Sequence, residues 1–457
     1  MSTDTRTFLF EQMPVRKAVF RQIAPAIFSQ MIALLYNLAD TYFVGMLNDP
    51  AQTAAITIAG PPFLMLTAIS NLFGIGGAGM IARSLGKKDA QTARAVSSIS
   101  FWMGALSALL FSFLFLLLAE PVLTLCGATE ATLCLARGYA QHTVVFGGLF
   151  TVLNIMLANL VRGEGAAAQA SFGVSMGGIL NMLLDPLFIL PQFLGMGVIG
   201  AGMATALSNL AATVYFLLYL FLKKRQTVID LSPRHLNRIK HHLKNILSIG
   251  FPSALQYGLT VVAVAAQAVF VAKYATEATA ALGITKKLDQ LPLFFSIGVA
   301  NGILPLIAYN HSSGNQLRRR KIFRLGAGIS VGFAIPCVIV YELFAPHLAA
   351  LFISDPQTIT YSAAFLRRMV LAMPFMALVY PMIIQFQAMG RVREALIVSV
   401  LRKGVLDVPL LFLMDSLYPL YGCMWVQPVV DCFSLIVASI LYFRMMKGEP
   451  NETGPLI

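Results

Sequence analysis

The feature that most constrains this chain is a series of apolar runs of about 20 residues, which recurs from end to end. A helix rises about 1.5 Å per residue, so each run can cross the roughly 30 Å hydrocarbon core of a bilayer. Charged residues make up only 12% of the 457-residue chain. A water-soluble protein keeps about a quarter of its residues charged. The sequence therefore predicts an all-α membrane protein.

Twelve transmembrane helices are predicted from these runs. They cover residues 15–46, 52–82, 93–119, 138–161, 167–190, 196–222, 243–273, 279–309, 322–345, 360–388, 394–414 and 420–443. This is the pattern of a multi-pass protein in which most of the chain lies in lipid.

Lysine and arginine residues fall on alternate connections between the runs. These connections hold Arg6, Arg16, Lys17, Arg21, Arg83, Lys87, Lys88, Arg94, Arg162, Lys223, Lys224, Arg225, Arg234, Arg238, Lys240, Lys244, Arg318, Arg319, Arg320, Lys321, Arg324, Arg391, Arg393, Arg402, Lys403, Arg444 and Lys447. The opposite connections hold Asp49, Glu120, Glu130, Glu277, Glu342, Asp355 and Asp415. Basic connections stay on the cytoplasmic side, so we expect both termini to be cytoplasmic. The net charge of +13 then reflects membrane topology, and we expect no nucleic-acid partner.

The two halves of the chain resemble each other. Residues 21–30, "RQIAPAIFSQ", match residues 247–256, "LSIGFPSALQ", and place Pro25 opposite Pro252. Six spans in each half leave both halves in the same orientation, which predicts two six-helix lobes related by a parallel pseudo-two-fold repeat. We assign an N-lobe to residues 1–222, a basic cytoplasmic linker to 223–242 and a C-lobe to 243–457.

The stretch "GIGGAG" at 74–79 satisfies the glycine pattern of dinucleotide-binding loops. That chemistry requires a preceding strand and a helix that opens onto the phosphates, whereas these glycines lie inside an apolar span. Small residues there favour close packing of helices. P-loop and HExxH motifs are absent from the sequence. We therefore expect neither an enzyme nor a cofactor other than a coupling ion.

Two acids stand inside spans of the first half. Asp40 lies in the first span and Asp185 in the fifth, and Asn37 and Asn181 lie one helical turn before them. Both spans run from inside to outside. Asp40 lies 17 residues after Ile23, where the apolar run of its span begins, and Asp185 lies 18 residues after the start of its span, so both should reach about the same height. A carboxylate in the membrane usually faces a cavity or a partner.

Two carboxylates in one poorly solvated pocket either share a proton or hold a cation between them. Oxygen ligands suit a small hard cation, so the same atoms could bind H⁺ or Na⁺. Thr205, near the outer end of the sixth span, could add another oxygen. The alternative is that each acid caps a broken helix, because Pro186 follows Asp185.

The second half lacks this pair. Gln267 occupies the repeat position of Asp40, and Asp407 is shifted along its helix relative to Asp185. For Asp407 and Asp431 the sequence leaves a functional and a local structural role open. It gives no account of the basic pair Arg367 and Arg368.

Six residues are candidates for drug contacts because spans one, two, seven and eight should line the cleft between the lobes. They are Tyr36, Met65, Gln256, Tyr257, Phe294 and Phe295. Aromatic and methionine side chains suit the binding of varied flat cations. Core packing is the alternative role for each of them.

Several stretches together resemble the MATE family (multidrug and toxic compound extrusion), in particular its MepA-like and DinF-like bacterial members. The resemblance covers nearly the whole chain and rests on "EQMPVRKAVFRQIAPAIFSQMIALLYNLADTYFVG", "NLFGIGGAGMIARSLGKKD", "LDPLFIL", "GAGMATALSN" and "LPLIAYN". It implies a V-shaped bundle in the bacterial inner membrane that acts as a monomer. It also implies export of drugs and organic cations in exchange for H⁺ or Na⁺.

The family's N-lobe cation site carries over onto Asp40, Asn181, Asp185 and Thr205, which would also be the ligands of a bound Na⁺. The C-lobe acidic site of NorM-like members is not matched, since Gln256 lies near its span-seven position and span ten has no acid. The resemblance does not say whether H⁺ or Na⁺ is used.

Two other classes remain as alternatives. A flippase for lipid-linked precursors would share the two-lobe bundle but would need several basic residues in its central cavity. An intramembrane enzyme would need a nucleophile with a neighbouring base, and the six histidines lie mostly in loops or at span ends.

Overall fold

The computed structural model describes residues 6–47 and 49–447, and within these residues the chain forms helices and no strand. A short π-helix, η1 (Phe8–Gln12), precedes the N-lobe. The N-lobe consists of α2 (Val15–Gly45), α3 (Pro50–Gly86), α4 (Ala90–Leu125), α5 (Glu130–Ala140), η2 (Gln141–Phe146), α6 (Gly148–Gly163), α7 (Ala167–Ile189) and α8 (Gly197–Leu222). This confirms the all-α fold class.

The second half repeats this arrangement after a connection that contains η3 (Pro233–Arg238). The C-lobe consists of α9 (Ile239–Ala272), α10 (Thr276–Ser312), α11 (Gln316–Ala350), α12 (Pro356–Met369), η4 (Val370–Ala372), α13 (Met373–Ala388), α14 (Val392–Val400), η5 (Leu401–Val405), α15 (Asp407–Leu417) and α16 (Gly422–Lys447). The predicted linker 223–242 therefore includes the first turn of α9. Residues 1–5 and 448–457 of the predicted lobes lie outside the described residues.

Within the described chain, ten helical segments are long and apolar enough to cross a membrane. An eleventh candidate is the pair formed by α5 with η2 and α6, which meet at a bend of 50° and count as a span only if the two parts cross together. The remaining predicted span, 394–414, is divided into α14, η5 and α15. The break falls where Lys403 leaves helical geometry, with φ −136° and ψ 32°.

Arg402 and Lys403 require a correction to the charge analysis, which counted them with a cytoplasmic connection. They lie in η5, and only 1% of Arg402 is exposed. Arg402 can be buried because Asp431 of α16 neutralises it, with Nε and Oδ1 2.8 Å apart. A count of charges along the sequence cannot detect a partner that lies 29 residues away.

Glycines bring the two lobes into contact. A side chain at Gly250 of α9 would collide with the backbone of Leu72 in α3, and one at Gly302 of α10 would lie 2.8 Å from the Cα atom of Ile23 in α2. Gly76, in the "GIGGAG" stretch, likewise lies against the carbonyl of Ile246 in α9. The predicted role of these glycines in close helix packing is thus confirmed.

These contacts gather at one end of the bundle, which we call the basic end because Lys87, Lys88 and Arg318 lie there. The segment η1 fills the junction of the lobes at this end. The ring of Phe10 stacks on Tyr309 of α10 with centroids 4.5 Å apart. Arg318 of α11 donates to the Phe10 carbonyl at 2.7 Å. The first residues of the described chain therefore hold parts of both lobes together.

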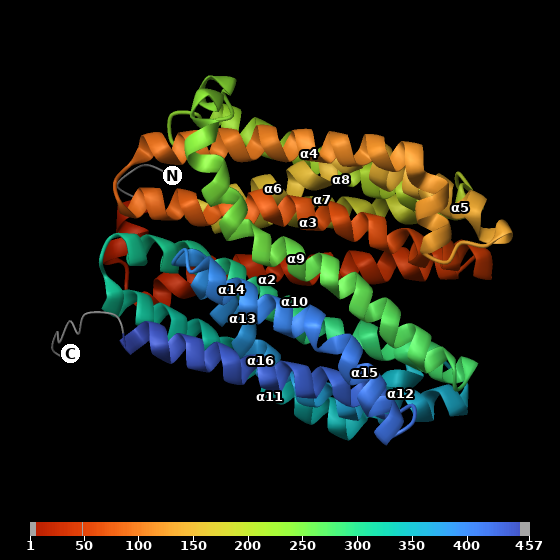
Figure 1. Ribbon diagram of the computed structural model, residues 1–457. Helices are drawn as coiled ribbons and strands as arrows, with labels where there is room; N and C mark the ends of the chain where they lie inside the picture. The colour runs from red at the N-terminus through yellow and green to blue at the C-terminus, as the bar shows by residue number, and fades with distance from the viewer. Residues whose placement is uncertain (1–5, 48, 448–457) are drawn as a thin grey trace.

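The lobes separate toward the opposite end, where α5 and α12 lie (Figure 1). Near this end, 64% of Tyr42 in α2 is exposed. The corresponding part of α9 exposes 63% of Val269. The bundle is thus packed at the basic end and divided at the other.

Candidate functional site

The acid pair predicted from the sequence comes from two helices that pack along each other, α2 and α7. Their close approach depends on Gly178, where a Cβ atom would lie 2.7 Å from Ile32 and 3.2 Å from the ring of Tyr36. Asp40 follows Tyr36 by one helical turn, and Asp185 follows Gly178 by two. The contact at Gly178 therefore brings the two carboxylates to neighbouring levels of the same helix pair.

The buried oxygens at this site exceed the available hydrogen-bond donors. Asn181 donates from Nδ2 to Oδ1 of Asp185 at 3.2 Å, and both residues are 2% exposed or less. In the described part of the chain, three buried acceptors here have no donor: Oδ1 of Asp40, Oδ2 of Asp185 and Oδ1 of Asn181. Buried polar atoms are nearly always paired, so these three acceptors are free to accept hydrogen bonds or to coordinate a cation.

No basic residue in the described part of the chain neutralises the pair. Neither Asp40 nor Asp185 forms a salt bridge with a lysine, arginine or histidine among the described residues. The two carboxylates repel each other. The phenol groups of Tyr36 and Tyr139 lie close enough for their charges to interact with those of both acids. Tyr139 lies at the end of α5 and is 7% exposed. Tyr139 was not among the residues predicted from the sequence, because nothing in its local pattern indicates that it interacts with the two acids.

The other two residues predicted for the ion site, Thr205 and Asn37, form no hydrogen bond with either acid. Thr205 is 6% exposed in α8, which packs along α7, and its carbonyl accepts a hydrogen bond from Asn209 at 2.9 Å. Asn37 is exposed and donates to the carbonyl of Ala33 in its own helix at 2.7 Å. The amide group of Asn37 is therefore already bonded within α2.

The oxygen atoms of this site suit two kinds of bound ion. Two carboxylates and an amide oxygen are hard ligands for an ion such as Na⁺. Two acids in a poorly solvated pocket also favour a shared proton, because both cannot ionise at low cost. Among the described residues no three His, Cys, Asp or Glu side chains cluster as a metal site, so a transition-metal centre has no support in this region.

The candidate drug-contact residues do not form one cluster. Met65 reaches across the lobe junction, with its Cε atom 3.7 Å from a Cβ position at Gly258, next to Tyr257. Gln256 donates to the hydroxyl of Tyr380 at 3.1 Å, inside the C-lobe. Met65 and Tyr257 are the pair that lies between the lobes.

The aromatic candidates differ in their surroundings. The ring of Phe295 stacks on Phe333 of α11 at a centroid distance of 3.8 Å and packs against a core cluster with residues from both lobes. Phe294 is half-buried. Tyr36 lies against α7 at Gly178 and belongs to the surroundings of the acid pair.

The acids of the C-lobe lie in a cluster of opposite charges. Oδ1 of Asp431 accepts from Arg402, and Oδ2 accepts from Gln427 at 2.6 Å. Oε1 of Gln427 in turn accepts from the ammonium of Lys403 at 2.5 Å. The Arg402 guanidinium also lies 4.3 Å from the centroid of the Tyr380 ring. Hydrogen bonds and a cation–π contact thus connect these five side chains.

Two further charged residues of α10 approach this cluster. Asp289 interacts with Lys286 and Lys403, and Asp407 interacts with the same two lysines. Neither Asp289 nor Lys286 was among the residues predicted from the sequence. The stretch "TKKLDQ" could have predicted an interaction between Lys286 and Asp289, because these residues are three apart and lie on one helical face.

The pair Arg367 and Arg368 now has a structural account. Arg367 of α12 donates to the carbonyl of Glu342 at 3.2 Å and lies 3.9 Å from its carboxylate. The guanidinium of Arg368 covers the ring of Tyr421 at 4.5 Å. Both are contacts between helices of the C-lobe.

Comparison with known proteins identifies the family. The family model described as MatE matches residues 25–187 and 252–413, and the two matches begin at Pro25 and Pro252, the prolines paired in the sequence repeat. The chain is similar to a protein of Staphylococcus aureus (strain MRSA252) named multidrug export protein MepA, with 28% identity over 454 residues and 99% of each chain covered. It is also similar to the Staphylococcus saprophyticus protein of that name, with 29% identity over 442 residues, covering 97% of this chain and 96% of the relative.

A solved structure agrees with these sequence matches. The structure described as the outward-facing conformation of a multidrug resistance MATE family transporter of the MOP superfamily has a TM-score of 0.88 and 25% identity, with 98% of each chain covered. The sequence, its repeat and its fold therefore lead to one conclusion: the chain belongs to the MatE family.

Proposed function

We propose that this protein is a secondary active antiporter that exports drugs and organic cations in exchange for H⁺ or Na⁺ bound in the N-lobe. The observation that carries this proposal is the set of three buried oxygens without donors on Asp40, Asp185 and Asn181. A site of this kind binds a proton or a small cation and releases it when its surroundings change. The names of the relatives, multidrug export proteins, support drugs as the exported substrates.

Alternating access is the mechanism we infer. The lobes are packed together at the basic end and divided at the other, and basic connections favour the cytoplasmic side. On this assignment the described conformation is open to the outside. Antiport then requires that the ion and the drug favour opposite conformations, so that only one of them is carried in each direction.

The decisive experiment is dye efflux from proteoliposomes that contain the purified protein. An organic cation dye is loaded, and either a proton gradient or a sodium gradient is imposed. We expect one of the two gradients to drive dye movement against its concentration, and that result names the coupling ion. Dye movement that ignores both gradients would contradict antiport.

Topology can be tested with the native thiol of Cys134, which is exposed on α5 at the divided end. In intact cells a membrane-impermeant maleimide should label Cys134, whereas a cysteine introduced at Ser313, in the turn after α10, should remain protected. The reverse pattern would show that the basic end faces outward.

A further inference from the structure

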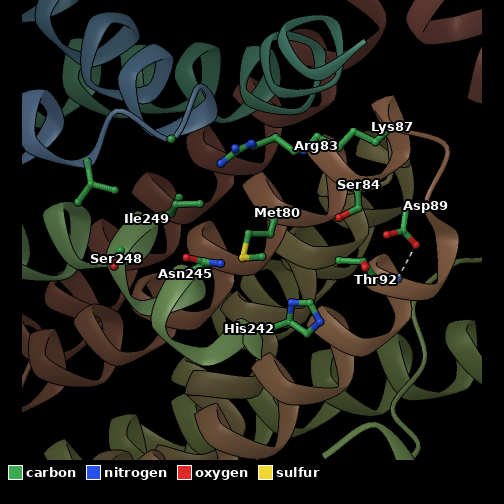
Figure 2. A pocket seen from close by; sticks show the side chains of 12 residues that line it. Met80, Arg83, Ser84, Lys87, Asp89, Thr92, His242, Asn245, Ser248 and Ile249 are labelled. Carbon is green, nitrogen blue, oxygen red and sulfur yellow. Dashed lines mark hydrogen bonds between the residues drawn. The ribbon is translucent and has the colours of Figure 1, made fainter. Parts of the chain in front are cut away.

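A second cavity, of about 460 Å³, lies at the basic end between the lobes, away from the acid pair. Its size is within the range of small-molecule sites. Figure 2 shows side chains from α3, from the start of α4 and from α9 turned toward this space. The lining residues of greatest chemical interest are Arg83, Ser84, Lys87, His242, Asn245 and Ser248.

The positive charge of Arg83 at this cavity has no acidic partner within hydrogen-bond or salt-bridge distance among the described residues. The guanidinium of Arg83 forms no hydrogen bond or salt bridge with any described residue, although the side chain is half-buried. It lies against Gly390, where a Cβ atom would be 2.5 Å from its Nη1 atom. A partly buried cation without an acid beside it requires a counter-ion. Lys87, one helical turn further along α3, adds a second positive charge.

Neutral donors complete the lining. The amide of Asn245 and the hydroxyl of Ser84 reach the cavity and form no hydrogen bonds to described residues. Helix α14 begins at Val392, also in the lining, and its N-terminus has no side-chain cap. Uncapped N–H groups and the positive end of the helix dipole favour an anion.

One acid, Asp89, also borders the cavity. Its carboxylate accepts a hydrogen bond from the Thr92 backbone N–H at 2.9 Å, so it caps α4. The hydrogen bonds from Thr92 keep the pKa of Asp89 below its ordinary value, and it is therefore ionised at neutral pH. Arg238 lies close enough to offset part of its charge. The cavity retains a positive balance from Arg83 and Lys87.

We infer that this cavity binds a phosphate group, held by Arg83 and Lys87 of the N-lobe and by Asn245 at the start of the C-lobe. Guanidinium groups bind phosphate oxygens in pairs, and ammonium groups contribute a point charge. The phosphate comes either from the headgroup of an anionic lipid or from a small molecule in solution. Both sources present the same tetrahedral oxygens to the site.

A phosphate at this position would connect the two lobes. The lining comes from α3 and α4 on one side and from α9 and the α13–α14 turn on the other. A ligand that touches both sides binds best when the basic end is closed, so it shifts the population toward that conformation. This is a regulatory role, separate from the ion and drug sites.

The test is thermal unfolding of the full-length protein with two probes. Inorganic phosphate is titrated in neutral detergent, and in a second arm the protein is placed in nanodiscs of phosphatidylcholine with or without phosphatidic acid. A ligand that binds the folded state raises the midpoint of unfolding with its concentration. A rise with inorganic phosphate shows that a free phosphate suffices, and a rise only with phosphatidic acid assigns the site to lipid headgroups.

Adjacent lysines supply a matched control. Lys87→Gln and Lys88→Gln remove the same charge from the same turn, but only Lys87 lines the cavity. We expect the midpoint rise to be strongly reduced in Lys87→Gln and Arg83→Gln and to be retained in Lys88→Gln. Equal responses in the two lysine variants, or no response to either probe in the wild type, would overturn the proposal. These readouts do not depend on transport, so they stand apart from the test of antiport.

The bridging role has its own measurement. Spin labels on Cys134 of α5 and on a cysteine introduced at Leu351, after α11, report the separation of the lobes at the divided end once the other cysteines are replaced. We expect whichever phosphate probe raises the unfolding midpoint also to increase the population in which the two spin labels are far apart. The increase should be smaller in Lys87→Gln. A distance distribution that the bound probe leaves unchanged would refute the bridging role.

Discussion

The two lobes treat their buried acids in opposite ways. In the N-lobe, Asp40 and Asp185 repel each other and have no basic partner among the described residues. Each has one carboxylate oxygen that accepts no hydrogen bond there. In the C-lobe, Asp431 is bound on both oxygens, by Arg402 and by Gln427. The repeat has thus produced one half with free negative charge and one half in which that charge is neutralised.

This difference indicates which half can bind a cation. A carboxylate that already forms a buried ion pair gains little from a proton or Na⁺, because the new cation would have to displace the guanidinium. A pair of acids without a base gains the whole interaction. The contrast extends to the repeat positions themselves: Gln267, which corresponds to Asp40, donates to the carbonyl of Cys423 at 2.9 Å.

The largest effect should come from removing either N-lobe acid. Asp40→Asn and Asp185→Asn should each abolish gradient-driven dye efflux, because a single carboxylate can no longer bind and release the ion as the pair does. The double variant should be scarcely worse than either single one, since the two groups act as a unit. Efflux from proteoliposomes measures the loss of transport directly. The affinity for the dye should change less than the efflux rate does.

The control for this loss is Glu120→Gln, an exposed acid in α4 that has no contact with the pair. It should retain efflux. Unfolding midpoints of all variants in detergent should stay close to the wild type, because neither N-lobe acid holds a basic partner that would be left uncompensated. Full efflux by Asp185→Asn at normal expression would remove the basis for N-lobe coupling.

Asp431→Asn should cause the next largest effect, and it should appear as lost stability. The change leaves Arg402 buried at 1% exposure with its charge uncompensated, which costs about 3–5 kcal/mol in comparable cases. The unfolding midpoint should therefore fall. Replacing both partners, as Arg402→Met with Asp431→Leu, should recover most of the loss. If Asp431→Asn instead folds normally but loses efflux, the C-lobe acid is a coupling group and the contrast between the lobes fails.

Much of this contrast could be foreseen from the sequence, and the rest depended on distant contacts. The apolar runs and the repeat predicted the helical fold, and the mid-span position of Asp40 and Asp185 predicted acids with a function. The pairing of Arg402 with Asp431 could not be predicted, because it joins residues on different helices across a π-helical turn. The interaction of Tyr139 with the acids could not be predicted either, because Tyr139 lies on another helix, α5.

Asp407→Asn should have a smaller effect than either change above. Asp407 is 4% exposed and its Oδ2 atom lacks a donor in the described residues, as in the N-lobe pair. It differs from the pair because Lys403 and Lys286 already offset its charge. We expect efflux to slow by less than about tenfold, or about 1.4 kcal/mol in barrier height. A complete loss in the proteoliposome assay would mean that the C-lobe cluster takes part in coupling.

The smallest effect should come from Asn37, which the sequence grouped with the ion site because it lies one turn before Asp40. Its side chain is exposed and donates to Ala33 within the same helix, so Asn37→Ala removes a local bond and introduces a better helix former. Surface substitutions of this kind change the free energy of unfolding by about 0.5 kcal/mol or less. A change of that size in the transport barrier would alter the rate by about twofold. Efflux by Asn37→Ala should therefore match the wild type within that range, under both proton and sodium gradients. A loss comparable to that of Asp40→Asn would show that the Asn37 amide turns toward the acids in another step of the transport cycle, and the ion site would then extend one turn further along α2.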